Sequence, residues 1–200
     1  MTPIRAVTVY CSSSRAIAPV YFEAARNLGR EIAAAGWAMV YGGNNIGLMD
    51  AVAGACRAAG ARVIGITPKS MADEGIADRA CAELVVTSTM RERKALLEAR
   101  GDAFIALPGG VGTFEEFFEI LVGRMLGYHA KPIVLLNVSG YYDPLIRMID
   151  HGIEQNFIKP KARDAFCVTT SVAQAIEYLK RHPPGQDVTG GTSAELSARE

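Results

Sequence analysis

Leu107-Pro108-Gly109-Gly110-Val111-Gly112-Thr113-Phe114-Glu115-Glu116 is the stretch around which the chain is organised. The apolar run 103–107 before it indicates a buried strand. Apolar side chains after it recur at helical spacing, at Phe114, Phe117, Phe118, Leu121 and Met125. The glycines therefore lie at a strand-to-helix turn, where free backbone N–H groups and the helix dipole favour an anion such as phosphate.

The spacing within this turn limits its interpretation. It is neither the GxGxxG of a dinucleotide-binding turn nor a Walker loop, so it does not indicate a dinucleotide or ATP. Thr113 and Glu116 also have the spacing of a capping box, and on spacing alone capping is favoured over catalysis. Carboxylates beside the turn would repel a phosphate unless they face elsewhere, for example toward the sugar.

Apolar strand-like runs alternate with helical patterns along the chain. Because the runs are continuously apolar, both faces of the sheet are expected to be covered, which predicts an α/β, Rossmann-like, doubly wound and mostly parallel sheet. The expected strands are 4–10, 37–41, 62–66, 83–87, 103–107, 132–136 and 167–169. The expected helices are 19–35, 48–59, 90–100, one after Gly112, 144–156 and 172–181, with a loop and short helix in 71–82.

The domain boundaries follow from composition. Residues 1–182 show no compositional shift and are expected to form one domain. Residues 183–200 are rich in Pro, Gly, Thr and Ser and have no large apolar side chain beyond Val188 and Leu196, which predicts a disordered tail.

Three loops of small residues follow expected strands, beginning at Ser12, Gly42 and Gly109. Ligands of parallel sheets bind at the carboxyl ends of strands, so the three loops belong to one rim. The serines after Cys11 fit helix capping and the binding of phosphate or sugar hydroxyls equally well. Gly42-Gly43 fits a plain turn and a ligand loop equally well.

A cluster of cations, Arg91, Arg93 and Lys94, begins the expected helix 90–100. Such clusters are usually solvated. Cations are, however, unfavourable at the amino end of a helix, and these follow a strand that ends at the same rim. A role facing an anion is therefore more plausible here than for most charge clusters.

Composition excludes several classes of function. The chain has 200 residues, of which half are hydrophobic, and its net charge is zero, which argues against broad nucleic-acid binding. No apolar run has the length of a membrane span, and the first residues do not have the layout of a signal peptide. Four scattered cysteines indicate reduced thiols in a cytoplasmic protein, and the isolated histidines predict no metal site. No GxSxG elbow of a serine hydrolase is present.

The motif Pro108-Gly109-Gly110-x-Gly112-Thr113-x-x-Glu116, with Met90-x-Glu92-Arg93-Lys94 upstream, resembles the Lonely Guy (LOG) family. Further similarity at 41–49, 127–132, 136–142 and 152–158 extends the resemblance over residues 6–180. It implies a Rossmann-like homodimer without a cofactor, with active sites near the subunit interface. The implied reaction is hydrolysis of the N-glycosidic bond of cytokinin riboside 5′-monophosphates, and of AMP as a further substrate, to free base and ribose 5-phosphate.

The resemblance also assigns roles to residues. Arg93 and Glu116 are the implied catalytic pair. The substrate-binding residues are Glu83, Lys94, Gly109, Gly110, Val111, Gly112, Thr113, Phe114 and Glu115, to which the rim loops add Ser12 and Gly43. The chemistry is reasonable, because breaking a ribosyl C–N bond builds oxocarbenium-like charge that a carboxylate stabilises. An arginine would hold the phosphate or ribose and position that carboxylate.

The chain departs from the family pattern at Asn44, Asp50, Arg91 and 122–125, which leaves the preferred base open. Two other functions are weighed against the enzyme. One is a nucleotide-binding module without turnover, which the altered stretch 122–125 would fit. The other is lysine decarboxylation, which needs pyridoxal phosphate on a Schiff-base lysine.

Overall fold

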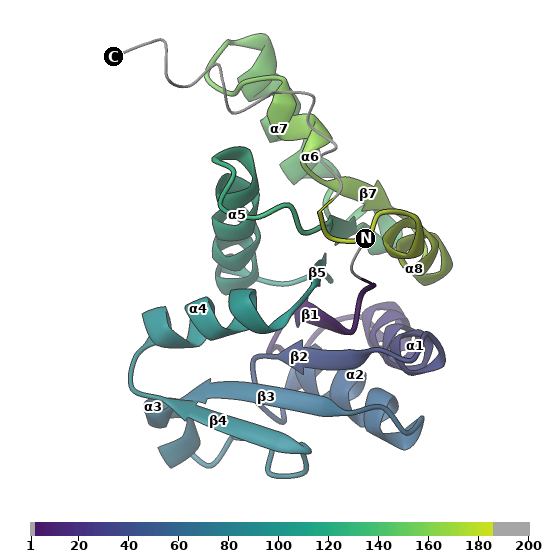
Figure 1. Cartoon of the computed structure of the whole chain (residues 1–200), viewed down its shortest axis with the longest axis vertical. Helices are drawn as coiled ribbons and strands as arrows, with labels where there is room; N and C mark the ends of the chain where they lie inside the picture. The colour runs from purple at the N-terminus through teal and green to yellow at the C-terminus, as the bar shows by residue number, and fades with distance from the viewer. Residues whose placement is uncertain (1–2, 186–200) are drawn as a thin grey trace.

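Seven parallel strands form one sheet in the computed structural model, which describes residues 3–185 (Figure 1). The strands are β1 (Ala6–Tyr10), β2 (Ala38–Tyr41), β3 (Val63–Pro68), β4 (Glu83–Thr87), β5 (Ala103–Ala106), β6 (Ile133–Leu136) and β7 (Cys167–Thr169). Their order is β4-β3-β2-β1-β5-β6-β7, so the direction of winding reverses between β1 and β5. The predicted α/β class is confirmed, and every strand pair in the described range is parallel.

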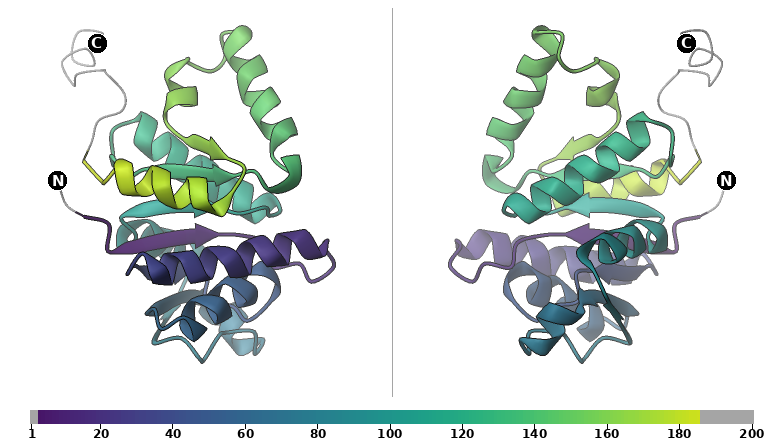
Figure 2. Two further views of the ribbon diagram at one scale, coloured as in Figure 1. Left: turned by 90° about the vertical axis from the view of Figure 1, so that its right-hand side faces the viewer. Right: turned by 90° about the vertical axis from the view of Figure 1, so that its left-hand side faces the viewer.

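Helices cover both faces of this sheet, as Figures 1 and 2 show. One face packs against α1 (Pro19–Ala34), α2 (Gly47–Ala58) and α8 (Val172–Arg181). The other face packs against α4 (Met90–Arg100), α5 (Val111–Met125) and α6 (Asp143–Glu154). The short elements are α3 (Lys69–Asp73), η1 (Val138–Gly140) and α7 (Lys161–Asp164).

The central strand β5 shows why the strands are apolar throughout. Successive side chains of a strand point to opposite faces. Ala103 and Ile105 pack with the core beneath α1, α2 and α8, whereas Phe104 and Ala106 pack with the core beneath α4 and α5. All four residues are fully buried. Covering both faces therefore demands apolar residues at every position.

Several element boundaries follow from local sequence. Pro19 is the first residue of α1, where its missing N–H costs nothing, and Gly36 follows the helix with φ 74°. Gly60 ends α2 in the same way, with φ 88°. The helix expected within 71–82 lies slightly earlier, at α3. The elements η1 and α7 were not predicted.

One expected core residue lies at the surface. Phe118 was predicted to belong to the apolar stripe of α5, but it is 38% exposed. The buried face of α5 is instead formed by Thr113, Phe117, Ile120, Leu121, Gly123 and Arg124. The predicted disordered tail lies outside the described residues from position 186 onward.

Candidate functional site

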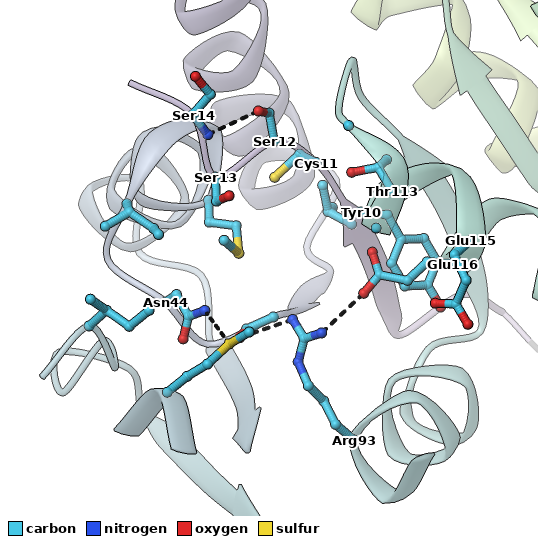
Figure 3. Close-up of a pocket in the computed structure, with 18 of the residues that line it drawn as sticks. Tyr10, Cys11, Ser12, Ser13, Ser14, Asn44, Arg93, Thr113, Glu115 and Glu116 are labelled. Carbon is cyan, nitrogen blue, oxygen red and sulfur yellow. Dashed lines mark hydrogen bonds and ion pairs between the residues drawn. The ribbon is translucent and has the colours of Figure 1, made fainter. Parts of the chain in front are cut away.

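A cavity of about 470 Å³ opens at the carboxyl ends of β1, β2 and β5, where the winding direction reverses (Figure 3). This is where open parallel sheets bind ligands. The three predicted rim loops meet here, as expected. The lining residues are Val9, Tyr10, Cys11, Ser12, Ser13, Ser14, Gly42, Asn44, Ile46, Met49, Met71, Ile76, Met90, Arg93, Gly110, Gly112, Thr113, Glu115 and Glu116.

The glycine turn ends at the amino terminus of α5, whose N-cap residue is Gly110. No side chain caps this helix, so the capping box predicted for Thr113 and Glu116 is wrong. The helix begins two residues before Thr113, which places Glu116 in its second turn. The first N–H groups of α5 have no acceptor inside the helix and remain open to an anion.

Neighbouring segments hold the glycine turn in place. A Cβ atom on Gly109 would lie 2.1 Å from Oγ1 of Thr113, so only glycine fits there. The Tyr141 hydroxyl donates to the carbonyl of Gly109, and the Tyr142 hydroxyl donates to the carbonyl of Leu107 at 2.7 Å. These contacts fix the turn before any ligand arrives.

The serine loop after β1 forms the adjoining wall. The amide of Ser12 donates to the carbonyl of Pro108 at 3.2 Å, which ties this loop to the glycine turn. The amide of Ser14 donates to Oγ of Ser12 at 3.0 Å. Ser12 therefore shapes its own loop and also lines the cavity, whereas it does not cap α1, whose N-cap is Ala18.

Arg93 lies at the floor of the cavity and points at Glu116 (Figure 3). Its guanidinium donates to Oε1 of Glu116 at 3.2 Å, to the carbonyl of Ile66 at 3.0 Å and to the carbonyl of Gly42 at 3.3 Å. The residue is only 6% exposed. Because two backbone carbonyls from separate segments hold the guanidinium, Arg93 orients Glu116 from a fixed position.

Glu116 is an unusually basic carboxylate. Burial raises its pKa from 4.5 to about 7, although the positive charge of Arg93 opposes the change. A carboxyl group with such a pKa exists in both protonation states near neutral pH. It can therefore stabilise positive charge when ionised, or exchange a proton with water or a leaving group.

The absence of a side chain at Gly42, in the glycine pair after β2, leaves room for the guanidinium of Arg93. A Cβ atom on Gly42 would lie 2.1 Å from a guanidinium nitrogen of Arg93. Gly43 has φ 70°, and a Cβ atom there would lie 2.8 Å from the backbone nitrogen of Ile66. Gly42 lines the cavity, while Gly43 packs behind it against β3. The pair is therefore more than a plain turn.

The other predicted residues are divided between the cavity and its surroundings. Gly110, Gly112, Thr113 and Glu115 line the cavity, whereas Gly109, Val111 and Phe114 belong to the same turn and helix but do not. Of the three clustered cations, only Arg93 lines the cavity.

Lys94 and Glu83 lie elsewhere. Lys94 pairs with Glu115 and with Glu119, the latter at 3.0 Å, so these carboxylates neutralise it outside the cavity. Glu83 begins β4 at the opposite end of the sheet and pairs with Arg62 and Arg100. The structure does not bring Glu83 to the cavity.

Sequence reasoning missed part of the cavity wall. Asn44, Met71, Ile76 and Met90 come from three different segments and have no motif in common. Asn44 was recognised only as a departure from the family pattern. Met90 was noted only as the first residue of the motif that contains Arg93. Met71 and Ile76 have no signal in the sequence, because their position depends on how residues 69–78 fold against the loop after β2.

The described residues offer neither a metal site nor a membrane-spanning helix. No group of three His, Cys, Asp or Glu residues suited to a metal ion occurs between residues 3 and 185. His129 bonds to the carbonyl of Ile120 at 2.9 Å and accepts from the amide of Lys131, and burial lowers its pKa to about 4. Within the same range, no helix combines the length and apolar character needed to cross a membrane.

The chain is similar to one family model and to curated plant proteins. The family model described as "Possible lysine decarboxylase" matches residues 49–179. A rice relative (Oryza sativa subsp. japonica), named "Probable cytokinin riboside 5'-monophosphate phosphoribohydrolase LOGL2", is 42% identical over 90% of this chain and 74% of its own length. The Arabidopsis thaliana cytokinin riboside 5'-monophosphate phosphoribohydrolase LOG2 is 38% identical over 92% of this chain and 86% of its own length.

Solved structures support the fold. The molybdenum cofactor carrier protein from Chlamydomonas reinhardtii superposes with a TM-score of 0.68 at 22% identity, covering 88% of this chain and 96% of that protein. The molybdenum cofactor binding protein from Rippkaea orientalis gives 0.66 at 23% identity, covering 90% and 97%. The two-part motif around Arg93 and Glu116, the family model and the curated relatives agree, and the chain belongs to the LOG family.

Proposed function

We propose that this protein hydrolyses the N-glycosidic bond of cytokinin riboside 5′-monophosphates and of AMP, releasing free base and ribose 5-phosphate. The observation that carries the proposal is the largely buried Glu116, which Arg93 orients in the second turn of α5, beyond the open amino end of that helix. The names of the curated relatives support cytokinin riboside 5′-monophosphates as substrates.

The geometry supports different roles for the residues at the two ends of the cavity. The amino end of α5 and the serine loop would hold the 5′-phosphate, which fixes the sugar beside Glu116. Ionised Glu116 would stabilise the positive charge that develops on the ribose as the C–N bond breaks. Its raised pKa also suits it to take a proton from the attacking water. The role of Arg93 is to hold Glu116 in position beside the sugar.

Lysine decarboxylation is less well supported by the site. Pyridoxal phosphate is held through a Schiff base to lysine. The described residues that line the cavity do not include a lysine, and the Lys94 ammonium is held by Glu115 and Glu119. These residues do not fit that cofactor, and the hydrolysis proposed here needs only water and side chains of this chain.

The proposal includes a homodimer. Apolar side chains lie exposed along α5 and just after it, with exposed fractions of 82% for Val111, 49% for Val122, 55% for Leu126 and 79% for Tyr128. By helical spacing, Val111, Phe118 and Val122 lie on one side of α5. Such exposed apolar side chains support burial against a second copy of the chain. Because α5 also carries Glu116, the interface would lie beside the active site.

The cysteines and the net charge indicate where the protein acts and what kind of ligand it binds. Free thiols at all four cysteines support a cytoplasmic location. The zero net charge supports a small-molecule substrate rather than a nucleic acid. In this proposal, residues 1–182 form one catalytic domain.

Chromatography of reaction mixtures tests the function. Purified protein and the Glu116→Ala variant are incubated with AMP, isopentenyladenosine 5′-monophosphate and the matching unphosphorylated ribosides. We expect free base only from the monophosphates and only with the unmodified protein. Nucleotide binding without release of base would instead establish a binding module and refute the hydrolase.

A further inference from the structure

Most of the side chains that line the cavity around Asn44 are apolar. Figure 3 shows Asn44 across the cavity from Glu116 and Thr113, with Arg93 between them at the floor. The surrounding lining consists of Ile46, Met49, Met71 and Ile76. A flat apolar group therefore fits between these side chains, and Asn44 offers the polar atoms on this wall.

The orientation of the Asn44 amide is fixed by two neighbours. Its Oδ1 accepts a hydrogen bond from the hydroxyl of Thr67 at 2.9 Å, and its Nδ2 lies 3.2 Å from the sulfur of Met71. Reversing the amide would place the oxygen against the thioether, where neither atom carries a hydrogen. The observed orientation is the one in which both contacts are attractive.

This orientation leaves a hydrogen-bond donor underused. An amide nitrogen carries two hydrogens, and a thioether is a weak acceptor. Among residues 3–185, no oxygen or nitrogen accepts from Nδ2 of Asn44. The residue is only 2% exposed, so bulk water does little to compensate. A ligand acceptor in the cavity would complete the bonding of this group.

The backbone around Asn44 is equally well fixed. Asn44 forms an antiparallel bridge with Ala77, and the amide of Asp78 donates to the carbonyl of Gly43 at 2.8 Å. The carboxylate of Asp78 is in turn held by the Tyr41 hydroxyl at 2.6 Å and by Arg57 at 2.5 Å. Binding therefore requires little ordering of this wall.

We propose that Asn44 determines base specificity by donating its Nδ2–H to an acceptor nitrogen on the edge of the purine ring. This inference rests on the proposed function. A phosphate at the amino end of α5 and an anomeric carbon beside Glu116 leave the base to occupy the wall formed by Asn44 and its apolar neighbours. Met71 and Ile76 then cover the faces of the base, and the amide recognises its edge.

Equilibrium binding tests this assignment in the full-length protein carrying Glu116→Gln, which prevents turnover. Affinities are measured for AMP and for ribose 5-phosphate, which has the phosphate and sugar but no base. Adding Asn44→Leu is expected to weaken AMP binding three- to tenfold, the range for one neutral hydrogen bond, and to leave ribose 5-phosphate binding unchanged. Equal weakening of both ligands, or no weakening of AMP, overturns the inference.

Two control variants separate the amide from its surroundings. Asn27→Leu makes the same change at an exposed position of α1 that does not line the cavity, and we expect AMP affinity to be retained. Thr67→Val removes the hydroxyl that orients Asn44, and we expect a loss for AMP alone. Deaza analogues of AMP, each lacking one ring nitrogen, then identify the acceptor, because Asn44→Leu should not further weaken the analogue that lacks it.

The outcomes distinguish this inference from the proposed hydrolysis. If the unmodified protein binds AMP but releases no base, the hydrolysis fails while the comparison with ribose 5-phosphate still decides the role of Asn44. If base is released normally and Asn44→Leu leaves AMP affinity unchanged, the inference fails alone. A Glu116→Gln protein that does not bind AMP overturns the inference as well.

Discussion

Replacing Glu116 with glutamine should change how stability depends on pH. The amide keeps the size of the side chain and an acceptor for Arg93 but does not titrate. In the unmodified protein, burial raises the pKa of this carboxyl from 4.5 to about 7. Below about pH 4.5 it is protonated in both the folded and unfolded states and contributes no pH dependence.

Between these two pKa values the unfolded chain ionises while the folded protein keeps its proton. Rising pH therefore favours unfolding, and the loss is complete above about pH 7. A difference of two to three pKa units corresponds to about 3 kcal/mol. The free energy of unfolding of the unmodified protein should thus fall by about 3 kcal/mol relative to Glu116→Gln between about pH 4 and pH 8.

Urea unfolding at one fixed protein concentration measures this difference. Trp37, the only tryptophan, is 8% exposed and provides a fluorescence signal. If the two proteins differ by a constant amount at every pH, the reasoning about the buried carboxyl is wrong. Turnover by the unmodified protein gives a second readout. If ionised Glu116 is required, the rate should rise with pH and level off above about pH 7.

Two further substitutions test the loops and the surface. Gly47→Ala should lower stability by about 2 kcal/mol and weaken nucleotide binding, because the position has φ 59° and the new Cβ would lie 2.5 Å from the backbone of Ser13. Gly60→Ala is its control, with φ 88° and open space, and equal losses in urea titrations would contradict the steric explanation. Val122→Glu should convert the proposed homodimer to a monomer in sedimentation velocity, whereas Arg30→Glu at an exposed position of α1 should not. A Val122→Glu protein that stays dimeric would place the interface elsewhere.

The fold was largely predictable because its signals are local. Apolar strands, glycine helix stops such as Gly36 and Gly60, and the regular alternation of elements indicated a doubly wound sheet before any contact was known. The meeting of the Ser12, Gly42 and Gly109 loops followed from the general rule that parallel strands present their carboxyl ends on one side.

The site was predictable only in part, because its details depend on contacts between distant segments. Thr113 and Glu116 have the spacing of a capping box, yet the helix begins at Val111 and Glu116 turns to Arg93. The spacing in the sequence could not show that a β3 carbonyl and a loop carbonyl would hold that arginine. Likewise, Asn44 could be noticed as unusual, but its partners Thr67 and Met71 follow only from the folded chain.

The strand order also constrains when the site can form. Strand β1 lies between β2 and β5, and the amide of Arg5 bonds to Asp102, 97 residues further along the chain. Contacts over such separations form slowly, because a long loop must close first. During synthesis, β1 can pair with β5, its second neighbour, only after about half of the chain has been made. A nucleotide contacting the loops after both β1 and β5 would then fasten the two halves together, so the substrate would also protect the newly folded protein from opening.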